Sequence, residues 1–449
     1  MKFYNVHTAI EWLNQQTNDI SRVGIDKIRV AVNYVGNPEK DLPAIHITGT
    51  NGKGSTTAFL RDLLLSQGLT VGSFTSPHIM RFNERIMMNG EPISDQDLIE
   101  VIEQMVEVNT YMETTPYGKL VFFELYTVMM LLYFRKMQPD VCLIEVGIGG
   151  ENDCTNVIDA QLAVLTTIGL DHADKLGDTK EEVAHEKAGI IKPFARVVTG
   201  LIEPGPLAVI EQRVEAMHAH IDRFNVEYGI TDIFNHFEQG STFNLWQKNI
   251  PADETQQNNF VVSMLGLHQI QNASVALQAF INWMDIIERP IDWVVAKPAL
   301  QQTKWIARME RIYNEPLVYI DGAHNVAGLT ALRQLVQEHL PHYQLTILYA
   351  GLSTKNQLAQ LPLLLSFEPH ELLLTEFNHP HAMTVDNFQE LIDQVPKIDT
   401  QYVHVERNWQ QFIDEYLLSH QTNTNQLLVI TGSLYFVSEI RQYFAQNVK

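Results

Sequence analysis

Cysteine is scarce: the 449-residue chain contains two, Cys142 and Cys154. Two cysteines cannot form the disulfide framework that staples many small secreted domains, which favours a reducing compartment. Their spacing is also not the Cys-x-x-Cys of metal and redox motifs. We therefore expect a cytoplasmic protein whose cysteines fill core or turn positions and bind no metal.

Basic residues are also few, since 31 Lys and Arg oppose 53 Asp and Glu, giving a formal net charge of −22. This excess argues against nucleic acid or an anionic membrane surface as a partner held by bulk charge. We therefore expect no nucleic-acid partner and no membrane partner. An anionic ligand would have to be bound by a few local positive groups.

Long apolar runs are missing, because the longest lies near residues 128–134 and a membrane span needs ~18 residues. The first 16 residues read as an amphipathic helix without the apolar region or cleavage site of a signal peptide. With 45% hydrophobic and 19% charged residues, the chain has the composition of a folded globular protein. Its length favours more than one domain.

Short β-branched runs alternate with longer helical stretches, which predicts βαβ units around mostly parallel sheets. The first series of expected strands comprises residues 44–48, 70–75, 141–146, 162–168 and 196–199, and the expected helices are 53–67, 95–111, 121–136 and 180–190. Residues 219–260 break the alternation, and we expect loops and short antiparallel strands there. The second series of strands comprises residues 318–321, 345–350, 372–377, 402–406 and 427–431.

The two series predict an α/β protein with two domains. Residues 1–300 would form a P-loop-type, mostly parallel sheet domain with a small appended β region. Residues 301–449 would form a smaller, Rossmann-like α/β domain, with the boundary near residues 299–303.

A glycine-rich turn lies between the expected strand 44–48 and the expected helix 53–67. Its glycines would let the backbone approach a ligand, and the N–H groups and helix dipole there favour an anion. Lys53 could reach terminal phosphates, and Ser55 or Thr56 could offer a hydroxyl to phosphate or Mg²⁺. The spacing differs from the usual G-x-x-x-x-G-K-[ST], but strand, loop and helix together predict a nucleotide site. Its candidate residues are Gly49, Thr50, Asn51, Gly52, Lys53, Gly54, Ser55 and Thr56.

This loop resembles that of the Mur ligase superfamily and, within it, of the folylpolyglutamate synthase family, some of whose members are also dihydrofolate synthases. Other segments are similar to family motifs, namely Thr75-Ser-Pro-His78, Arg81-Phe-Asn-Glu-Arg-Ile86, Leu143-Ile-Glu-Val-Gly-Ile-Gly-Gly150, Gly169-Leu-Asp-His172 and Glu186-Lys-Ala-Gly-Ile190. Independently of the resemblance, Glu145 ends an apolar run, which places it at the carboxyl end of an expected strand, where α/β folds bind ligands. The matches continue to Arg441 and so cover nearly the whole chain.

The resemblance implies ATP and two Mg²⁺ ions. Ser76 and Glu145 would help to hold one ion, and His172 and Glu145 the other. Lys187 would be carbamylated, because a carbamate supplies the oxygen ligands that Mg²⁺ prefers whereas an ammonium would repel it. The implied catalytic residues are Lys53, Lys187, His172 and Arg308.

Further nucleotide contacts are implied at the junction and in the second domain. Residues 267–278 read as a loop into a helix, where Asn272 would suit an N-cap. The resemblance instead places Gln269 and Asn272 beside the nucleotide. It also implies that Arg308 contacts phosphate through its planar guanidinium.

The motif Tyr319-Ile-Asp-Gly-Ala-His-Asn325 follows an expected strand and matches a family motif. By that resemblance Asp321 would bond the ribose and His324 would contact phosphate.

Substrate contacts are implied for Asp153, Lys355 and Ser433, with Lys355 as the cation of the second domain and Ser433 near glutamate. Glu151 stands where the bifunctional pattern has Arg. Exchanging a cation for a carboxylate changes how an anionic pterin substrate is held, which favours folylpolyglutamate synthase over dihydrofolate synthase activity.

The implied reaction adds L-glutamate to the terminal γ-carboxylate of a reduced folate, with ATP giving an acyl phosphate and then ADP and phosphate, in a monomeric enzyme. A bifunctional enzyme that also uses dihydropteroate is the main alternative. A Mur-type peptidoglycan ligase lacks support, because a further N-terminal domain is missing and the Thr-Ser-Pro-His loop differs. A regulatory P-loop NTPase is a further alternative, but that function would not explain why Glu145, His172 and Lys187 converge. An inactive binding protein is another alternative, but it would not need every matched metal-site residue.

Overall fold

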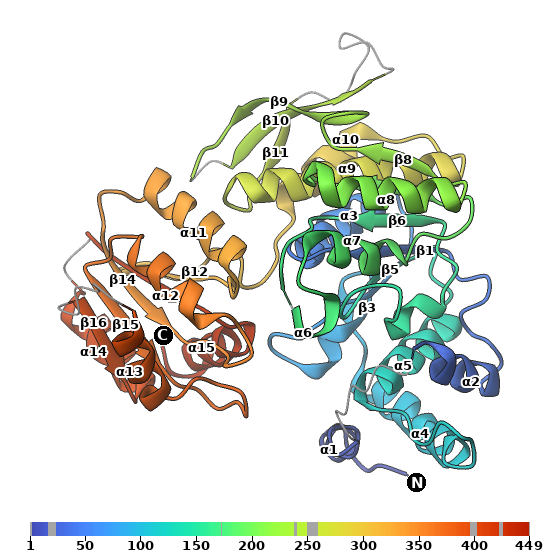
Figure 1. Ribbon diagram of the computed structural model, residues 1–449, viewed down its shortest axis with the longest axis horizontal. Coiled ribbons are helices and arrows are strands. Elements are labelled where there is room, and N and C mark those ends of the chain that lie inside the picture. Colours follow the sequence, from blue (N-terminus) through green and yellow to red (C-terminus); the bar gives the residue numbers. More distant parts are fainter. Residues whose placement is uncertain are drawn as a thin grey trace. The chain divides into compact units, whose positions relative to one another are not determined.

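The computed structural model describes residues 2–16, 24–171, 173–237, 240–248, 259–395, 402–421 and 425–448, apart from the side chains of residues 173 and 174. The chain divides into two compact units (Figure 1). Unit 1 comprises Met1–Phe234, Thr242–Val262 and Gln269–Thr303, and unit 2 comprises Asn235–Ser241, Ser263–His268 and Lys304–Lys449. Unit 2 thus takes up two short segments that precede residue 300. The division into domains 1–300 and 301–449 stays a prediction.

Unit 1 is built on an eight-stranded sheet with the order β4-β3-β2-β5-β1-β6-β7-β8. The strands are β1 (Ala44–Thr48), β2 (Val71–Phe74), β3 (Ile86–Met88), β4 (Glu91–Pro92), β5 (Val141–Glu145), β6 (Leu162–Leu165), β7 (Arg196–Thr199) and β8 (His220–Arg223). The run from β2 to β8 is parallel, and β3 and β4 add an antiparallel edge. The predicted mostly parallel sheet is confirmed.

One expectation for this sheet is wrong. Residues 220–223 were predicted within a region of loops and antiparallel strands, but β8 pairs in parallel with β7. A parallel partner needs a crossover connection, which the helix α8 (Pro204–Ala216) provides.

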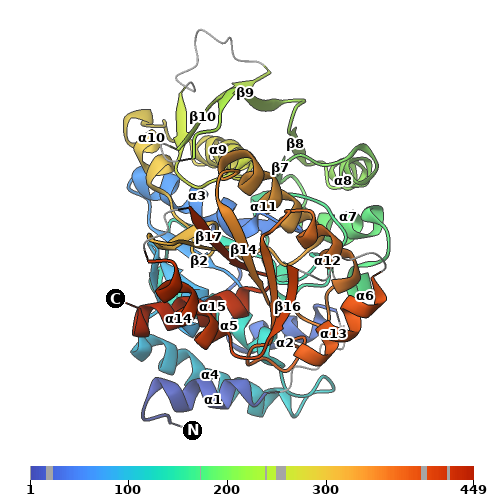
Figure 2. The same ribbon diagram turned by 90° about the vertical axis from the view of Figure 1, so that its left-hand side faces the viewer.

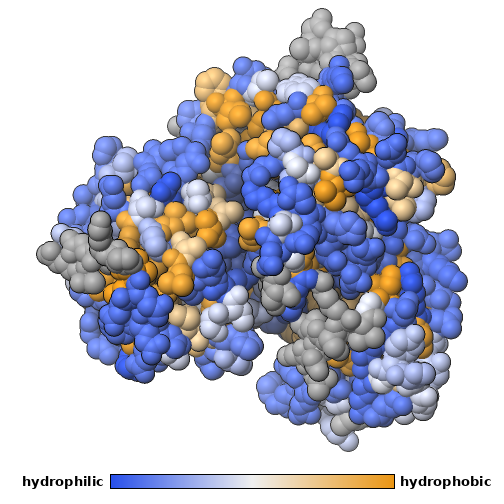
Figure 3. Space-filling model, in the orientation of Figure 1, coloured by the Kyte–Doolittle hydropathy of each residue, from blue (hydrophilic) through white to orange (hydrophobic). Residues whose placement is uncertain are grey.

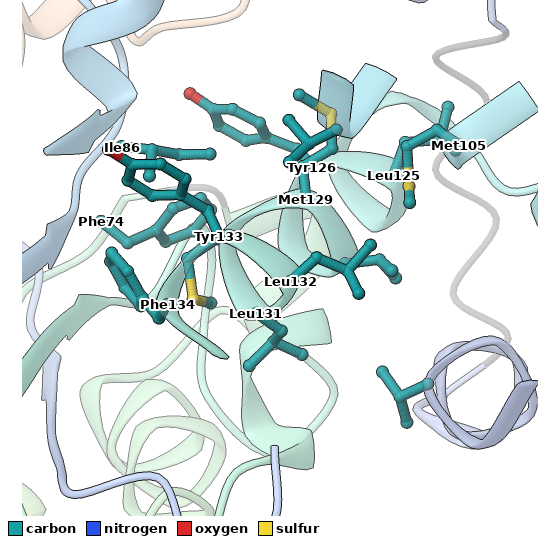
Figure 4. Packing of buried hydrophobic residues seen from close by; sticks show 14 of the residues in the cluster. Phe74, Ile86, Met105, Leu125, Tyr126, Met129, Leu131, Leu132, Tyr133 and Phe134 are labelled. Atoms are coloured by element: carbon teal, nitrogen blue, oxygen red, sulfur yellow. The ribbon is translucent and has the colours of Figure 1, made fainter. Parts of the chain in front are cut away.

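The sheet of unit 1 is covered by helices whose apolar sides form its core. They are α1 (Val6–Asn14), α2 (Asp26–Tyr34), α3 (Lys53–Ser66), α4 (Asp95–Met112), α5 (Phe122–Met137), α6 (Ala173–Leu176), α7 (Lys180–Ala188), α8, α9 (Leu267–Ile286), α10 (Trp293–Gln302) and the 3₁₀ turns η1 (Phe82–Arg85) and η2 (Cys154–Val157). The middle of α5 is apolar all round, as expected of a buried helix. Figure 4 shows its Tyr126, Tyr133 and Phe134 beside Phe74 and Ile86 of the sheet.

A second, three-stranded sheet has the order β11-β10-β9, with β9 (Tyr228–Phe234), β10 (Ser241–Gln247) and β11 (Phe260–Val262). β9 and β10 are antiparallel, so the predicted appended β region is confirmed. Phe243 and Leu245 are buried two residues apart, because alternate side chains of a strand share a face.

Unit 2 is built on a six-stranded sheet with the order β12-β13-β17-β14-β15-β16. Its strands are β12 (Glu310–Tyr313), β13 (Leu317–Ile320), β14 (Gln344–Tyr349), β15 (Glu371–Thr375), β16 (Val403–Glu406) and β17 (Gln426–Thr431). All except the edge strand β12 are parallel. The predicted second α/β domain with a parallel sheet is therefore confirmed in its fold class.

Helices lie on both faces of the unit 2 sheet, namely α11 (Val326–His339), α12 (Gln357–Leu365), α13 (Val385–Gln394), α14 (Trp409–Ser419) and α15 (Leu434–Asn447). Residues of α11, α12 and α13 form one core with Leu427 and Val429, and those of α14 and α15 form another with Leu428 and Ile430. Figure 2 shows α12 and α13 on one side of β14 and β17 and α14 and α15 on the other.

The visible face in Figure 3 is largely hydrophilic, as the high charge of the chain leads one to expect. Among the described residues, no helix has both the length and the apolar character required to span a bilayer.

Candidate functional site

The carboxyl ends of neighbouring parallel strands bring several predicted residues to one edge of the unit 1 sheet. Glu145 lies opposite Ile47 in the register, and Phe74 lies opposite the residue before Glu145. Ser76 follows Phe74 by two residues, and the phosphate loop begins two residues after Ile47. Open parallel sheets bind their ligands at this edge. The structure thus places Ser76 and Glu145 at the same end of the sheet as the phosphate loop.

The phosphate loop is fixed by the segment that follows β6. The N–H of Thr50 donates to Thr167 O (2.9 Å), and the N–H of Asn51 donates to Thr167 Oγ1 (3.0 Å). Thr50 Oγ1 donates to Gly169 O (3.0 Å), and Thr166 Oγ1 donates to Asn51 O (2.6 Å). The strand predicted at 162–168 is therefore too long, because β6 ends at Leu165 and the next residues leave the sheet to hold this loop. Their role was missed, although two hydroxyl residues directly after a buried strand were a usable signal.

Two glycines of the loop occupy positions that admit no side chain. Gly49 has φ +153°, and a Cβ there would overlap Thr166 Oγ1. Gly52 has φ +88°, and a Cβ there would overlap the amide oxygen of Asn272. Both backbone conformations are rare for L residues with side chains. The second contact also places Asn272 directly against the phosphate loop.

Asn272 and Gln269 lie together on α9. Asn272 Nδ2 donates to Gln269 Oε1 (3.1 Å), and both side chains are buried. The expectation that Asn272 could cap a helix is wrong, because α9 already begins at Leu267 and Asn272 lies in its second turn.

The start of α3 completes the phosphate loop. Lys53 Nζ donates to Gly49 O (2.8 Å), so its ammonium lies over the loop. Gly54 begins the helix with Lys53, and the side chains of Ser55 and Thr56 are buried. Within the described ranges, Thr56 Oγ1 has no hydrogen-bond partner. A buried hydroxyl of this kind fits a role in binding a ligand oxygen.

Lys187 lies on α7 with only 4% of its surface exposed. Burial, followed by the charge of Lys53, lowers its pKa to about 7, against the opposing charges of Asp171, Asp153 and Glu186. The structure therefore brings Lys187 into the electrostatic surroundings of the phosphate loop. His172, the predicted second ligand of Mg²⁺, lies outside the described residues.

Asp153 shapes the loop that follows Glu145. Its Oδ2 accepts the N–H of Ile148 (3.0 Å), and its Oδ1 accepts the N–H of Thr155 (3.0 Å) and the Thr155 hydroxyl. Burial raises the pKa of this carboxyl, while these hydrogen bonds oppose the shift. Both oxygens are thus engaged in holding residues 147–155 in place.

The loop that carries Ser76 is held by two residues that sequence reasoning left without a role. Glu84 accepts the N–H groups of Ile79 (2.9 Å), Met80 and Arg81 (3.0 Å each). Arg85 is nearly buried, and its Nε donates to His78 Nδ1 (2.7 Å).

The guanidinium of Arg85 also lies 5.0–5.7 Å from the ring centroids of Phe82, Phe122 and Tyr126. Burial and the charge of Arg85 lower the pKa of His78 to about 4. The motif 81–86 was the available signal for this arrangement.

In unit 2, Arg308 stands between two residues with left-handed backbones, Ala307 (φ +59°) and Met309 (φ +42°). Such conformations are unfavourable for residues with a Cβ and cluster at functional sites. Asp321 holds this turn, because its Oδ2 accepts the N–H of Met309 (2.8 Å) and its Oδ1 that of Ala323 (2.9 Å). Burial raises the pKa of Asp321, and the charge of Arg308 opposes the shift. The structure therefore brings Arg308 and Asp321 together.

Two histidines accompany this turn. His324 Nδ1 donates to Gly322 O (2.8 Å), and a Cβ on Gly322 would lie 2.9 Å from Arg308 Nη1. Burial and the charge of Arg308 lower the pKa of His268 to about 4. His268 was missed, although it directly precedes the predicted Gln269.

Lys355 and Ser433 lie in other loops of unit 2. Lys355 lines a hollow of about 400 Å³ with residues of α12 and α13. Ser433 is buried and is the N-cap of α15, where its Oγ accepts the N–H of Tyr435 (3.3 Å). Its capping role is thus structural, and its contact with substrate stays a prediction.

The donor set at the unit 1 edge fits Mg²⁺ if Lys187 is carbamylated. The described residues contain no group of three or more His, Cys, Asp and Glu side chains arranged to hold a metal. Ser76 and Glu145 are oxygen donors of the kind that Mg²⁺ prefers. The Lys187 amine is not, but a carbamate on it would be.

The fold and the phosphate loop define a ligase of the Mur type, and residues 47–280 match the Mur ligase middle domain. Residues 305–443 match the C-terminal domain of dihydrofolate synthetase. The chain is 32% identical over 444 residues to the dihydrofolate synthase/folylpolyglutamate synthase of Bacillus subtilis (strain 168), covering 97% of this chain and 98% of that protein. The chain belongs to the folylpolyglutamate synthase/dihydrofolate synthase family.

Two further likenesses agree with this membership. The folylpolyglutamate synthase of Lacticaseibacillus casei is 33% identical over 428 residues, covering 93% of each chain. A solved FPGS–AMPPCP–folate complex has a TM-score of 0.83 and 30% identity, covering 98% of this chain and 99% of that one.

Proposed function

We propose that this protein is an ATP-dependent ligase that joins the amine of L-glutamate to the γ-carboxylate of a reduced folate. The observation that carries the proposal is that the phosphate loop lies at the same sheet edge as Ser76 and Glu145. The buried Lys187 interacts electrostatically with Lys53 of this loop, and the chain matches the family over nearly its full length. The related complex with AMPPCP, an ATP analogue, and folate supports both ligands. The monomeric state and cytoplasmic location stay predictions.

The phosphate loop would bind ATP through its N–H groups, Lys53 and the buried Thr56 hydroxyl. Gln269 and Asn272 would contact the nucleotide beside it. In unit 2, the turn that Asp321 shapes would present Arg308 to phosphate oxygens. His324 would contact phosphate as well. A hydrogen bond from the ribose to Asp321 stays a prediction.

Ser76, Glu145, His172 and a carbamylated Lys187 would hold two Mg²⁺ ions. When bound, Mg²⁺ neutralises charge on the phosphates. Carbamylation needs a neutral amine: the Lys187 nitrogen bonds to the carbon of CO₂, the π electrons of one C=O bond move to its oxygen to give the carbamate anion, and the nitrogen releases a proton to solvent. A buried lysine with a pKa of about 7 supplies that neutral form at neutral pH.

The chemistry proceeds in two steps. A γ-carboxylate oxygen of the folate attacks the γ-phosphorus of ATP, the bond to ADP breaks, and an acyl phosphate forms. The neutral amine of L-glutamate then attacks the acyl carbon, and the tetrahedral intermediate releases phosphate and a proton. Lys53 and Arg308 would align and neutralise the phosphates, which is the main demand of phosphoryl transfer. The substrates would be bound by Lys355, Ser433 and Asp153. Asp153 would contribute through the loop that it shapes.

Folate-dependent ADP release tests the proposal. With Mg-ATP and L-glutamate, tetrahydrofolate should give ADP and a folate heavier by one glutamyl group, measured by a coupled assay and mass spectrometry. Omission of L-glutamate should stop sustained turnover. If no folate supports ADP release, the proposed function is wrong.

A bifunctional enzyme that also uses dihydropteroate is the second candidate. The position of Glu151 in the structure is compatible with it. Its carboxylate lies 3.8 Å from His185 Nδ1, and both residues line a hollow of about 180 Å³ with Arg213 of α8. None of the described residues around this hollow belongs to the phosphate loop. The carboxylate at position 151 is therefore a weak argument against dihydropteroate as a substrate.

The substitution Glu151→Arg tests this point. Because the side chain lies at a partly exposed surface, we expect the ratio of kcat/KM values for tetrahydrofolate and dihydropteroate to change by less than ~3-fold. Glu151→Gln is the matched control without a new cation. A gain of ~10-fold or more in dihydropteroate use by the Arg variant alone would show that the residue selects the pterin.

A further inference from the structure

Strand β1 carries two fully buried polar side chains, His46 and Thr48, between apolar neighbours. Residues two apart on a strand share a face, so both point to the same side of the sheet. Thr48 Oγ1 donates to Gly149 O (2.8 Å), and His46 Nε2 lies 2.9 Å from Thr155 Oγ1. The strand that leads into the phosphate loop is therefore bonded twice to the loop that follows Glu145.

The direction of these hydrogen bonds fixes the state of His46. Thr155 Oγ1 donates its single proton to Asp153 Oδ1, so it can only accept from the imidazole. His46 therefore carries a proton on Nε2. Burial, with a smaller effect from the charge of Lys192, lowers its pKa to about 3, so that the ring is neutral and Nδ1 is unprotonated.

We propose that His46 is a positioning residue for the ligase reaction. Its Nε2–H fixes the Thr155 hydroxyl, Thr155 fixes the Asp153 carboxylate, and Asp153 holds the N–H of Ile148. This chain of bonds sets the course of residues 147–155, directly after Glu145, relative to the strand that ends at the phosphate loop.

A purely apolar packing role does not account for His46. Its Nδ1 is buried and, within the part of the chain that the structure describes, has no hydrogen-bond partner. An orphaned buried acceptor is unfavourable, and Ala44, two residues away on the same face of the strand, packs in the apolar core of unit 1. Sequences depart from such rules mainly where function requires it.

Two substitutions separate positioning from packing. His46→Leu removes the donor, whereas His46→Gln keeps an N–H near the place of Nε2. For His46→Leu we expect kcat/KM for the folate to fall ~10–100-fold, as for other supporting partners of a site, while KM for Mg-ATP changes little. His46→Gln should recover most of this loss. Equal losses in the two variants would overturn the proposal, as would wild-type kinetics for His46→Leu.

Thr155 provides an independent test. Thr155→Val removes the hydroxyl, and Thr155→Ser keeps it as the matched control. The losses of His46→Leu and Thr155→Val should not add in the double variant, because both break one chain of bonds. Additive losses would overturn the proposal. If His46→Leu does not fold, the Val and Ser variants decide by the same kinetic comparison.

The kinetic readout rests on the proposed function, but the coupling does not. If the wild-type protein shows no folate-dependent turnover, the proposed function fails. The same double-mutant cycle measured as Tm values still tests the link between His46 and Thr155, with non-additive shifts expected and additive shifts overturning it.

Discussion

Lys187→Ala is expected to lower the rate of folate-dependent ADP release by ~10³-fold or more, because it removes both a group beside the phosphate loop and the proposed carbamate ligand. The side chain is buried and lies in the electrostatic field of Lys53 and Asp171. Truncation to alanine leaves space in which a small carboxylate or bicarbonate could stand for the lost carbamate. High concentrations of such anions should therefore restore part of the activity.

Lys180→Ala is the matched control for this experiment. Lys180 begins the same helix α7, is partly exposed and pairs with Glu203, so its loss should leave turnover nearly unchanged. Carbamylation itself is measured by ¹³C NMR after incubation with labelled bicarbonate, where the wild-type signal should disappear in the Lys187 variant. Wild-type rates in Lys187→Ala would remove the carbamate from the mechanism.

Much of the fold follows from local sequence pattern. Strands 44–48 and 196–199 were predicted to the residue, because each is a short β-branched run between turn or polar residues. The predicted strand 162–168 was too long, because two threonines with high strand propensity bond to the phosphate loop instead. The strand β8 was missed as part of the main sheet, because the sequence His-Ile-Asp-Arg is largely polar and partly exposed at a sheet edge.

The candidate site was predictable where chemistry is concentrated in a motif. The phosphate loop, Glu145 and Ser76 stand at strand ends, so their common edge follows from the parallel sheet. The supporting contacts were not predictable, because the partners are far apart in the chain: His46 and Thr155 are 109 residues apart, and Asn51 and Thr166 are 115 apart. No local pattern contains such a pairing.

Asp153 and Asp321 show a second limit of sequence reasoning. Both stand in motifs whose resemblance implies contacts with substrate and ribose, which stay predictions. In the structure their carboxylate oxygens accept backbone N–H groups of their own loop and, for Asp321, also of the turn at Met309. A carboxylate after a strand can bind a ligand or organise a turn, and the residue type is the same in both cases.

Gly49→Ala should lower kcat/KM for Mg-ATP by ~10²-fold, because the phosphate loop would have to move to admit a methyl group. A Cβ at this position would overlap Thr166 Oγ1 and lie 3.1 Å from the backbone nitrogen of Thr167. Those two atoms belong to the segment that holds the loop, so neither can yield without loosening it. The backbone at φ +153° is also unfavourable for alanine.

Gly68→Ala separates this crowding from backbone strain alone. Gly68 also has a positive φ (+74°), but a Cβ there would meet nothing within 4 Å. It should destabilise the protein by ~1–2 kcal/mol and leave KM for Mg-ATP unchanged. Nucleotide binding by titration calorimetry and Tm by thermal unfolding give the two readouts for each variant. If Gly49→Ala loses only stability and binds Mg-ATP as the wild type does, the loop tolerates displacement and its close approach to Thr166 is not needed for nucleotide binding.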